Sequence, residues 1–387
     1  MNTTEKYDKY VMRSYGRLPL AIESGSGVLA LNGDREYVDF GSGIGTNSLG
    51  YCDKDWVDAV CAQVQALQHT SNYYYNEAGA EFAEKLCEVT GYTNLFLGNS
   101  GAEANECAIK IARKYSFDKY GKNRHNIITL KNSFHGRTIA TLSATGQEEF
   151  HNYFFPFLDG FANAEPNDLV DIAGKLGSTV CAVMLEYIQG EGGVCPLDKE
   201  FVDLVYVLCA EKDILVIADE VQTGAGRTGK FLCGEHYGHK ADITTMAKGL
   251  FGGLPGGVCL SGEKCAGVLT AGTHGSTFGG NPVVMSGGKV VLDKAANPEF
   301  LAEVAAKGDY IREKLSALPE VVSIDGMGLM LGVTLKTMNA KDVMKAALDK
   351  GLLTLTAKEK LRLLPPLTID YQSIDKGSSI LTDILKG

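Results

Sequence analysis

Cysteine pairs at short spacing are missing from this chain of 387 residues, although it contains ten cysteines. The closest pair, Cys259 and Cys265, is six positions apart, which excludes a zinc ribbon and a thioredoxin-type redox motif. A disulfide scaffold is not expected in a chain this long, and several cysteines lie in apolar patterns such as 205–209. We therefore expect reduced, buried thiols of the kind found in cytosolic proteins.

Long hydrophobic runs and basic runs are missing as well. No stretch of 18 apolar residues occurs, so the sequence predicts no membrane-spanning helix. Residues 1–17 have no apolar core, so a secretory signal peptide is not expected. Lys and Arg number 37 against 47 Asp and Glu, and the net charge of −10 makes nucleic acid or a membrane surface a poor partner. We expect a cytoplasmic protein.

What the sequence does have is glycine and a large apolar content. Hydrophobic residues make up 45% and charged residues 22%, which is enough apolar surface for a large core and excludes disorder for most of the chain. The 46 glycines exceed the usual share of roughly 7% and gather in short loops. The length predicts two domains, or one large α/β unit with an appendage.

The centre of the chain predicts a βαβ unit. Apolar segments at 126–130, 179–188 and 213–220 have the length and composition of buried parallel strands. Between the last two, apolar residues of 201–209 recur at helical spacing. Two further segments, 243–249 and 256–262, are expected to continue the sheet. This order favours a large, mostly parallel sheet.

The two ends of the chain differ from its centre. Residues 28–40 predict two short strands around the turn signal Asn32-Gly33-Asp34. From about residue 286, helical, strand, helical and apolar segments follow one another at 298–317, 328–336, 340–350 and 361–367. This pattern predicts a smaller α+β domain.

Asp219 and Lys248 are the first candidates for chemistry. Asp219 ends the apolar run 214–218, and a carboxylate at the carboxyl end of a buried strand needs a positive partner. The pyridinium of pyridoxal phosphate is one such partner, while a helix N-cap or an ordinary ion pair is the alternative. Lys248 lies between a short apolar strand and glycines, where desolvation would make it a nucleophile. Taken alone, Lys248 fits a surface lysine better.

The start of one helix could bind an anion. Ser100 and Glu103 have the spacing of a capping box, so Gly101 and Ala102 are expected to open a helix. Its free N–H groups and the positive end of its dipole suit a phosphate. A well-capped helix without a ligand is the alternative.

Three residues after the strand at 126–130 could contact a ligand. Arg137 could form a bidentate pair with a carboxylate, or an ordinary surface ion pair. Phe134 could lie flat against an aromatic ligand, or belong to the core. His135 lies between them.

Two other motifs are weak. Residues 224–229 match G-x-G-x-x-G, but the strand before them is separated by an insert and no helix is expected directly after them, as a dinucleotide fingerprint requires. His236 and His239 lack a third metal ligand nearby, so we expect no metal site.

The order of the motifs is more specific than any one of them. It resembles the class III pyridoxal-phosphate aminotransferases, over a region from about residue 18 to the C-terminus. The motifs that carry this resemblance are NSGAEANE at 99–106, FHGRT at 134–138, EYIQGE at 186–191, DEVQTG at 219–224, Lys248-Gly249 and THGSTFGGNP at 273–282. Within the class, the length and the segment LRLLPPL at 361–367 look most like the acetylornithine aminotransferase family of arginine biosynthesis.

The resemblance implies an α/β fold of type I among pyridoxal-phosphate transferases. Such a fold has a large, mostly parallel sheet domain with helices on both faces and a smaller α+β domain. The implied division is 1–45 for the N-terminal segment of the small domain, 46–285 for the large cofactor-binding domain and 286–387 for the C-terminal small domain.

The resemblance also implies how pyridoxal 5'-phosphate is bound. Lys248 would carry the cofactor covalently and act as the catalytic acid and base. Asp219, the second catalytic residue, would pair with the pyridine nitrogen, and Gln222 would reach the phenolic-oxygen side of the ring.

Four further residues are implied to contact the cofactor. Gly101 and Ala102 would bind the phosphate through their backbone N–H groups, and Phe134 would stack on the ring. Thr277 is expected to reach the phosphate bound by the other subunit, which implies a homodimer.

The implied substrate contacts involve two arginines. Arg137 and Ser276 would contact the acylated amino acid. Glu186 is expected to pair with Arg362 and to swing away from it, so that Arg362 can bind the α-carboxylate of glutamate.

Three positions depart from the patterns of related proteins. Many relatives have Thr or Ser where this chain has Ala102, so one hydroxyl contact to the phosphate is missing. Most have Pro where this chain has Tyr187, so the backbone after Glu186 is expected to differ. Ile44 stands where ornithine δ-aminotransferases carry a tyrosine, and this favours an acylated ornithine.

The implied reaction transfers the δ-amino group of N2-acetyl-L-ornithine to 2-oxoglutarate, giving N-acetyl-L-glutamate 5-semialdehyde and L-glutamate. Other ω-amino donors stay open: succinylornithine, 4-aminobutyrate, ornithine and an acylated lysine. A nicotinamide dehydrogenase built on 224–229 and a non-catalytic binding protein are the rivals from other classes. The presence of Lys248, Asp219 and both arginines argues against the binding protein.

Overall fold

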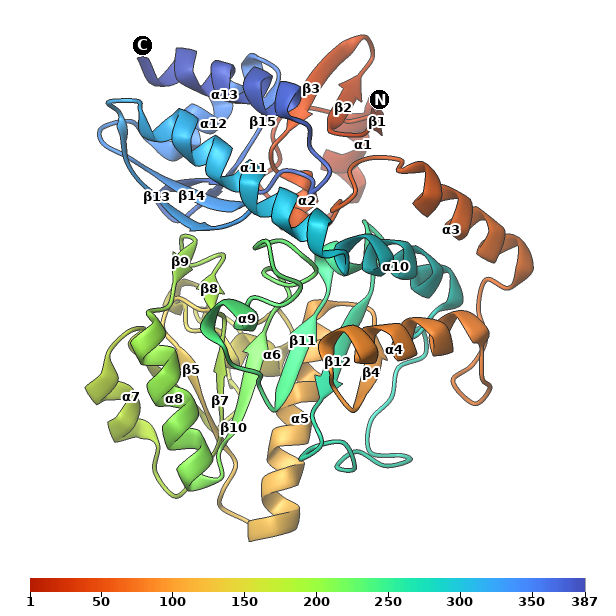
Figure 1. Cartoon of the computed structure of the whole chain (residues 1–387), viewed down its shortest axis with the longest axis vertical. Coiled ribbons are helices and arrows are strands. Elements are labelled where there is room, and N and C mark those ends of the chain that lie inside the picture. The colour runs from red at the N-terminus through yellow and green to blue at the C-terminus, as the bar shows by residue number, and fades with distance from the viewer. Residues whose placement is uncertain (387) are drawn as a thin grey trace.

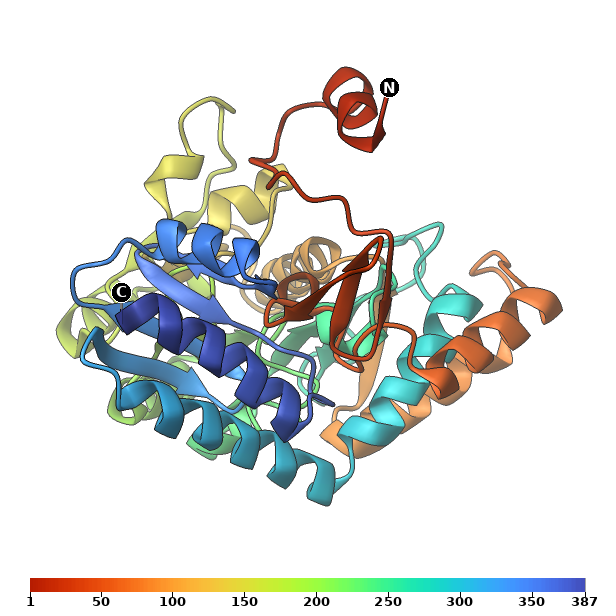
Figure 2. The same ribbon diagram turned by 90° about the horizontal axis from the view of Figure 1, so that it is seen from above.

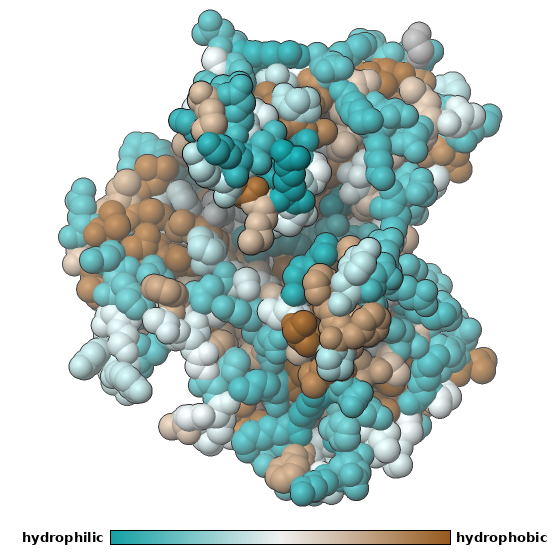
Figure 3. Space-filling view, turned by 180° about the vertical axis from the view of Figure 1, so that it is seen from behind, coloured by the Kyte–Doolittle hydropathy of each residue, from teal (hydrophilic) through white to brown (hydrophobic). Residues whose placement is uncertain are grey.

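The computed structural model describes residues 1–386; Gly387, the last residue of the domain predicted at 286–387, lies outside the described residues. Figure 1 shows a lower part built around one large sheet and an upper part built around two small ones. The view from behind in Figure 3 shows the molecule hollowed between these parts. The N-terminal and C-terminal ends of the chain both lie in the upper part.

The large sheet has seven strands. In spatial order they are β4 (Asn94–Gly98), β12 (Gly257–Ser261), β11 (Ile243–Met246), β10 (Leu215–Asp219), β7 (Val180–Leu185), β5 (Asn126–Leu130) and β6 (Phe161–Ala164). All neighbours from β11 to β6 are parallel, which confirms the predicted mostly parallel sheet. β12 runs antiparallel to both of its neighbours, and the sequence pattern did not indicate this.

Helices cover both faces of this sheet because its strands are apolar on both sides. On β10, Leu215 and Ile217 pack in the cluster that contains helix α5 (Gly101–Tyr120). Val216 points to the other face and packs in the cluster that contains α8 (Lys199–Lys212). Each such side chain is buried, and full burial stabilises the fold by roughly 1.5–3 kcal/mol per large apolar residue.

Three helices pack side by side at the right of Figure 1: α3 (Lys54–Ala66), α4 (Glu77–Thr90) and α10 (Pro282–Ala295). The shorter elements around the large sheet are α6 (Ile139–Ala144), α7 (Leu169–Lys175), α9 (Gly234–Tyr237), β8 (Ile188–Gln189), β9 (Cys195–Pro196) and the 3₁₀ turns Glu148–Phe150 and Lys248–Phe251.

The upper part joins the two ends of the chain. One sheet contains β1 (Ser24–Ser26), β2 (Leu29–Asn32), β3 (Arg35–Asp39) and β15 (Leu352–Leu353), and the other contains β13 (Val321–Met327), β14 (Met330–Leu335), β17 (Lys360–Leu363) and β16 (Leu355–Ala357). The predicted hairpin at 28–40 is the antiparallel pair β2–β3. β15 pairs parallel with β3, so N-terminal and C-terminal strands share a sheet.

The helices of the upper part are α11 (Pro298–Ser316), α12 (Ala340–Asp349) and α13 (Tyr371–Lys386), together with the short α2 (Ser42–Gly45). Helix α1 (Thr3–Tyr10) projects from the body in Figure 2, and none of its residues is buried. Within residues 1–386, no helix combines the length and the apolarity needed to cross a membrane.

The domain division keeps the status of a proposal. The boundary predicted between residues 285 and 286 falls inside α10, which packs against α3 and α4 of the lower part. We propose that the large domain extends to the turn between α10 and α11.

The cysteines are thiols. All ten are free, and most are buried as expected. Cys52 and Cys61 are exposed, so the expectation of burial does not hold for them.

Candidate active site

A pocket of about 470 Å³ lies at the carboxyl ends of the parallel strands β5, β7, β10 and β11. Open α/β sheets place ligands in this position because the connections diverge there. The pocket brings together most of the site residues predicted from the sequence: Gly101, Ala102, Phe134, Arg137, Glu186, Asp219, Gln222 and Lys248. Ser276, Thr277 and Arg362 do not line it.

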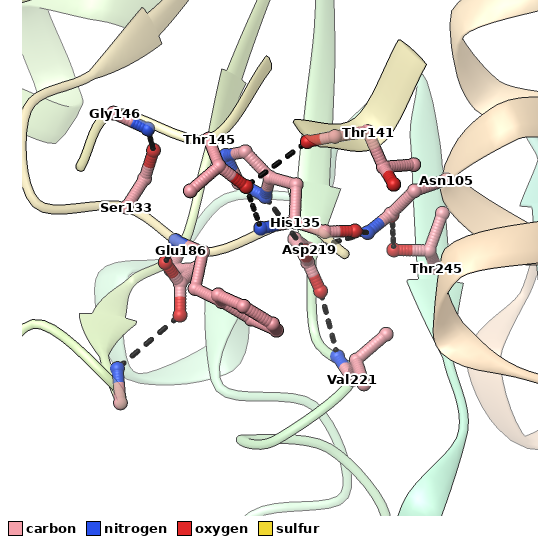
Figure 4. Close-up of polar contacts among 12 residues, drawn as sticks. Asn105, Ser133, His135, Thr141, Thr145, Gly146, Glu186, Asp219, Val221 and Thr245 are labelled. Atoms are coloured by element: carbon pink, nitrogen blue, oxygen red, sulfur yellow. Dashed lines mark hydrogen bonds and ion pairs between the residues drawn. The ribbon is translucent and has the colours of Figure 1, made fainter. Parts of the chain in front are cut away.

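Asp219 is held in a network of hydrogen bonds at the floor of this pocket (Figure 4). Its Oδ2 lies 2.7 Å from Nδ1 of His135 and accepts a bond of 2.8 Å from Nδ2 of Asn105. Its Oδ1 accepts only the backbone N–H of Val221, at 3.1 Å. The carboxylate is 4% exposed, so its orientation is set from one side while Oδ1 keeps a free acceptor site.

Sequence reasoning missed Asn105 and Thr245. The Asn105 amide donates to Asp219 and to the His135 carbonyl, and its oxygen accepts from the Thr245 hydroxyl at 2.7 Å. Its signal was available, because Asn105 lies four residues after Gly101 and therefore on the same face of α5. Thr245, a buried hydroxyl within a strand, carries no such signal.

Lys248 follows β11 and lines the pocket as a partly buried side chain. Its φ of 44° lies in the left-handed region, which is costly for a residue with a Cβ. Burial lowers the pKa of its amine, and the nearby Arg362 lowers it further, against the opposite effect of Glu191. No hydrogen bond from this amine is found within residues 1–386, so it is free to react.

The N-terminus of α5 forms one wall. Ser100 caps the helix by accepting the N–H of Glu103, as the spacing predicts. The Glu103 carboxylate accepts from the backbone of Asn99, one residue earlier than a capping box requires. A Cβ on Gly101 would lie 2.7 Å from the Val221 side chain, so only glycine fits there. The first N–H groups of this helix remain available for an anion.

Phe134 and Arg137 form the mouth of the pocket. The Arg137 guanidinium lies 4.1 Å from the ring centre of Phe150 and 5.5 Å from that of Phe134. Among the described residues no carboxylate pairs with Arg137, which is exposed. It is therefore an open cation beside the pocket.

Arg362 has a different partner from the one predicted. It was expected to pair with Glu186, but its Nη1 lies 2.6 Å from Oε1 of Glu191 and its Nη2 lies 3.3 Å from Oε2. Gln222 bonds both partners, accepting from Arg362 at 3.2 Å and donating to Glu191 at 3.3 Å. Burial alone would raise the pKa of Glu191, but the guanidinium outweighs it and the net shift is downward.

Glu186 is bound by backbone groups instead. Its Oε1 accepts the N–H of Phe134 at 2.9 Å, and its Oε2 accepts the N–H of Gly190 at 3.2 Å. Burial raises the pKa of this carboxyl group to about 7. The physical reason for the wrong prediction is the path of the chain after β7, which turns Glu191 and not Glu186 towards Arg362.

Ser276 and Thr277 lie beside the pocket without lining it. The Ser276 hydroxyl accepts from the Asn99 side chain at 2.9 Å and from the Gly279 N–H at 3.0 Å. Thr277 is exposed.

The two weak motifs form no site of their own. Residues 224–229 are a loop and open no helix, contrary to what a dinucleotide fingerprint requires. His236 bonds to Thr228, and His239 pairs with Asp203 at 2.7 Å. No group of side chains suited to a metal ion occurs in the described part of the chain.

The chain belongs to the class-III aminotransferases. The model of the family named "Aminotransferase class-III" matches residues 10–385, almost the whole length. The enzymes of this class use pyridoxal 5'-phosphate, and this chain is an aminotransferase with that cofactor.

Named relatives point in the same direction. The chain is 50% identical to an acetylornithine aminotransferase of Haemophilus ducreyi, over 97% of this chain and 96% of that protein. Its fold matches the crystal structure of an ornithine aminotransferase from Toxoplasma gondii with a TM-score of 0.94 at 29% identity, over 99% of this chain and 94% of that one. An N-acetylornithine aminotransferase from Stenotrophomonas maltophilia matches with a TM-score of 0.85 at 32% identity, over 99% and 98%.

The pocket fits pyridoxal phosphate in its donors and acceptors. An unbonded amine suits an aldehyde, an acceptor site on a buried aspartate suits a protonated ring nitrogen, and free helix N–H groups suit a phosphate.

Proposed function

We propose that this aminotransferase transfers the δ-amino group of N2-acetyl-L-ornithine to 2-oxoglutarate and so forms N-acetyl-L-glutamate 5-semialdehyde and L-glutamate. The observation that carries the proposal is the pair of arginines near Lys248: Arg137 is open, while Arg362 is covered by Glu191. The 50% identity to an acetylornithine aminotransferase supports the same substrate.

The cofactor supplies an aldehyde that accepts the amino group and a protonated ring that accepts the electrons of the bond being broken. Lys248 would bind the cofactor and move a proton at the reacting carbon, for which its lowered pKa suits it. Asp219 would keep the ring nitrogen protonated, and His135 and Asn105 hold Asp219. Gly101 and Ala102 would bind the phosphate by their N–H groups, and Phe134 would contact the ring.

The two arginines separate the two substrates of the reaction. Acetylornithine brings one carboxylate at the far end of a long chain, and Arg137 at the mouth is placed to bind it. Glutamate brings two carboxylates, and the second needs a cation deeper in the site. Arg362 supplies that cation when Glu191 moves away, while in the other half-reaction Glu191 keeps this 3% exposed charge paired.

We also propose that the enzyme is a homodimer. Thr277 is exposed, and beside it lies an aromatic surface that includes Phe278, Tyr73 and Tyr75. The two loops touch, because the Asn72 amide donates to the carbonyl of Ser276. Exposed aromatic surface of this kind is typical of a protein interface. A second copy seated here would bring its Thr277 to the phosphate site of the first.

We further propose that the protein is cytoplasmic, because this localisation fits the state of its cysteines. All ten are thiols, and two of them are exposed, a state that reducing compartments maintain.

Ornithine δ-aminotransferase activity is the second candidate, favoured by the TM-score of 0.94 to the Toxoplasma gondii enzyme. Ile44 is the feature that argues against it, since it offers no hydroxyl to a free α-amino group. Its backbone has a φ of 63° and its side chain is 41% exposed.

Turnover of alternative donors tests the proposal. With 2-oxoglutarate as acceptor, we expect kcat/KM for acetylornithine to exceed that for ornithine and for 4-aminobutyrate by at least roughly tenfold, the value of one charged contact or more. Succinylornithine is the closest chemical variant and measures how far the acyl group matters. Faster turnover of free ornithine than of acetylornithine would replace the proposal by the second candidate.

A further inference from the structure

Glu186 is a buried carboxyl group of the active site that has no role in binding the cofactor or either substrate as proposed. It lines the pocket and is 5% exposed, yet no lysine or arginine within residues 1–386 pairs with it. Burying a carboxyl group without a cation is costly, so the hydrogen bonds that Glu186 accepts must offset that cost.

The contacts of Glu186 join two segments that follow neighbouring strands. One oxygen accepts from the N–H of Phe134, which lies after β5, and the other accepts from the N–H of Gly190, which comes directly after β8 in the segment that follows β7. A third hydrogen bond joins the same two segments: the Gln189 side chain donates to the Lys131 carbonyl at 2.8 Å.

Gly190 lies directly before Glu191 and directly against Gln222. A Cβ on Gly190 would come within 2.4 Å of the Gln222 amide oxygen, the same oxygen that accepts from Arg362. A shift of Gly190 therefore moves both Glu191 and the side chain that bonds Glu191 and Arg362 together.

We propose that Glu186 is a positioning residue that holds the Gly190–Glu191 segment in place and thereby sets how tightly Glu191 covers Arg362. The inference rests on the proposed function in one respect, since the covering of Arg362 is what separates the two substrates. Glu186 itself touches neither arginine; it acts through the backbone of Gly190.

Hydrogen exchange of the holoenzyme tests directly whether Glu186 holds the Gly190–Glu191 segment in place. In Glu186→Ala, the amides of Phe134 and Gly190 each lose their hydrogen bond to the carboxyl group, and the segment around Gly190 is released. We therefore expect the amides of residues 187–195 and of Phe134 to exchange roughly tenfold faster or more. Glu186→Gln keeps one acceptor oxygen and should give an intermediate rate. Glu211→Ala is the matched control, because Glu211 is an exposed carboxylate on α8. Unchanged exchange of 187–195 in Glu186→Ala would overturn the proposal.

A double-mutant cycle tests the consequence for specificity. The quantity measured is the ratio of kcat/KM for glutamate to kcat/KM for acetylornithine, in wild type, Glu186→Ala, Glu191→Ala and the double variant. We expect the ratio to rise about three- to tenfold in Glu186→Ala and further in Glu191→Ala. The double variant should equal Glu191→Ala, because Glu186 acts only through Glu191. Additive effects, or no change in Glu186→Ala, would overturn the proposal.

Failure of the proposed function would look different. If Glu191→Ala leaves the ratio unchanged, then covering of Arg362 does not separate the substrates, and the specificity half of this inference is overturned with it. Faster exchange at 187–195 in Glu186→Ala would in that case support only the holding of the loop. If Glu186→Ala fails to fold, Glu186→Gln carries both measurements.

Discussion

The two halves of the site, the pocket itself and the ion pair between Arg362 and Glu191 near Lys248, are built in different ways. The half that binds the cofactor comes from one sheet and one helix, and its groups are fixed by buried bonds: Asp219 by His135, Asn105 and the Val221 backbone. The half that binds the second substrate depends on an ion pair across parts far apart in sequence, Arg362 on β17 and Glu191 after β8.

This difference follows from what each half must do. The ring nitrogen and the phosphate are the same in both half-reactions, so a rigid set of donors and acceptors costs nothing in reorganisation. The carboxylate partner of Arg362 must change between the half-reactions. A pair between two side chains can exchange partners, because each guanidinium–carboxylate contact is replaced by a similar one.

Removing Lys248 should give the largest effect. The variant tests the half of the site that binds the cofactor, formed by Asp219, Lys248 and the start of α5, which we call the rigid half. Lys248→Ala loses both the group that binds the cofactor and the group that moves the proton, and proton transfer alone contributes roughly 10²–10⁴-fold. We expect turnover to fall by at least about 10³-fold in a protein that still folds and binds cofactor weakly. Single-turnover kinetics together with the melting temperature check this, and near-normal turnover would remove Lys248 from its role.

Asp219→Asn should separate chemistry from binding in the same half. The amide keeps the shape of the side chain and a bond to Asn105, but it cannot keep a ring nitrogen protonated. We expect kcat to fall roughly 10²–10³-fold, as for the loss of one preorganised electrostatic contact, with a smaller loss of cofactor affinity.

Asp242→Asn is the matched control for this prediction. Asp242 is a carboxylate at the other end of the same sheet, where it accepts the Val216 N–H at 2.8 Å. This variant should lower stability and leave kcat close to that of wild type. Equal losses of kcat and cofactor affinity in Asp219→Asn would contradict the ring-nitrogen role.

The rigid half is also the half that sequence could predict. Asp219 ends one apolar strand and Lys248 follows another, and parallel strands bring their carboxyl ends to one crevice, so motif and topology predict the same site. The helix start at Gly101 was predictable from the cap at Ser100. These residues could be placed because local pattern determines the strand, the helix and their ends.

The exchangeable half could not be predicted to the same degree. Glu186 and Glu191 lie in one motif, and nothing in their spacing says which of them faces Arg362. The answer depends on the turn after β8, where Val194 has a φ of 52°, and on the register of β17 against β14. Both features arise from tertiary contacts. The same holds for the pairing of β15 with β3, whose residues are more than three hundred positions apart.

The titration of Glu220 tests whether the interior beside Asp219 excludes water strongly enough to shift the pKa of a carboxyl group. Glu220 follows Asp219 and is 2% exposed, with its carboxylate accepting from the backbones of Cys233 and Gly234. Burial raises the pKa of Glu220 to about 7, against the opposite effect of these bonds. The folded state therefore holds a proton that the unfolded chain releases above pH 4.5, so this group's contribution to stability falls between about pH 4.5 and 7.

The variant Glu220→Gln removes this titration. We expect the unfolding free energy of wild type minus that of the variant to decrease by roughly 3 kcal/mol from pH 4.5 to pH 8, since each pKa unit is worth about 1.4 kcal/mol. Denaturant unfolding of the cofactor-free protein at several pH values measures it, with Glu211→Gln as the exposed control. A difference that stays constant or grows with pH would show that Glu220 keeps its charge at an ordinary pKa.

Glu191→Gln should give the smallest effect, and it tests whether the ion pair between Arg362 and Glu191 can exchange partners. The amide retains the shape of the side chain and one hydrogen bond to Arg362, but it removes the charge that balances this buried guanidinium. Arg362 then has a weaker partner in the half-reaction of the ω-amino donor, and the carboxylate of an ordinary α-amino acid competes for it. We expect the preference for glutamate over acetylornithine to rise about 5- to 20-fold, the lower part of the range for coupling between sites.

Because Asp219 and Lys248 are untouched in Glu191→Gln, cofactor affinity should stay as in wild type, which separates this variant from any change in the rigid half. The check is single-turnover rates for both amino donors on wild type and variant at equal cofactor occupancy. An unchanged ratio would mean that the pair between Arg362 and Glu191 is as fixed as the bonds around Asp219, and that the second substrate is admitted by some other movement of the site.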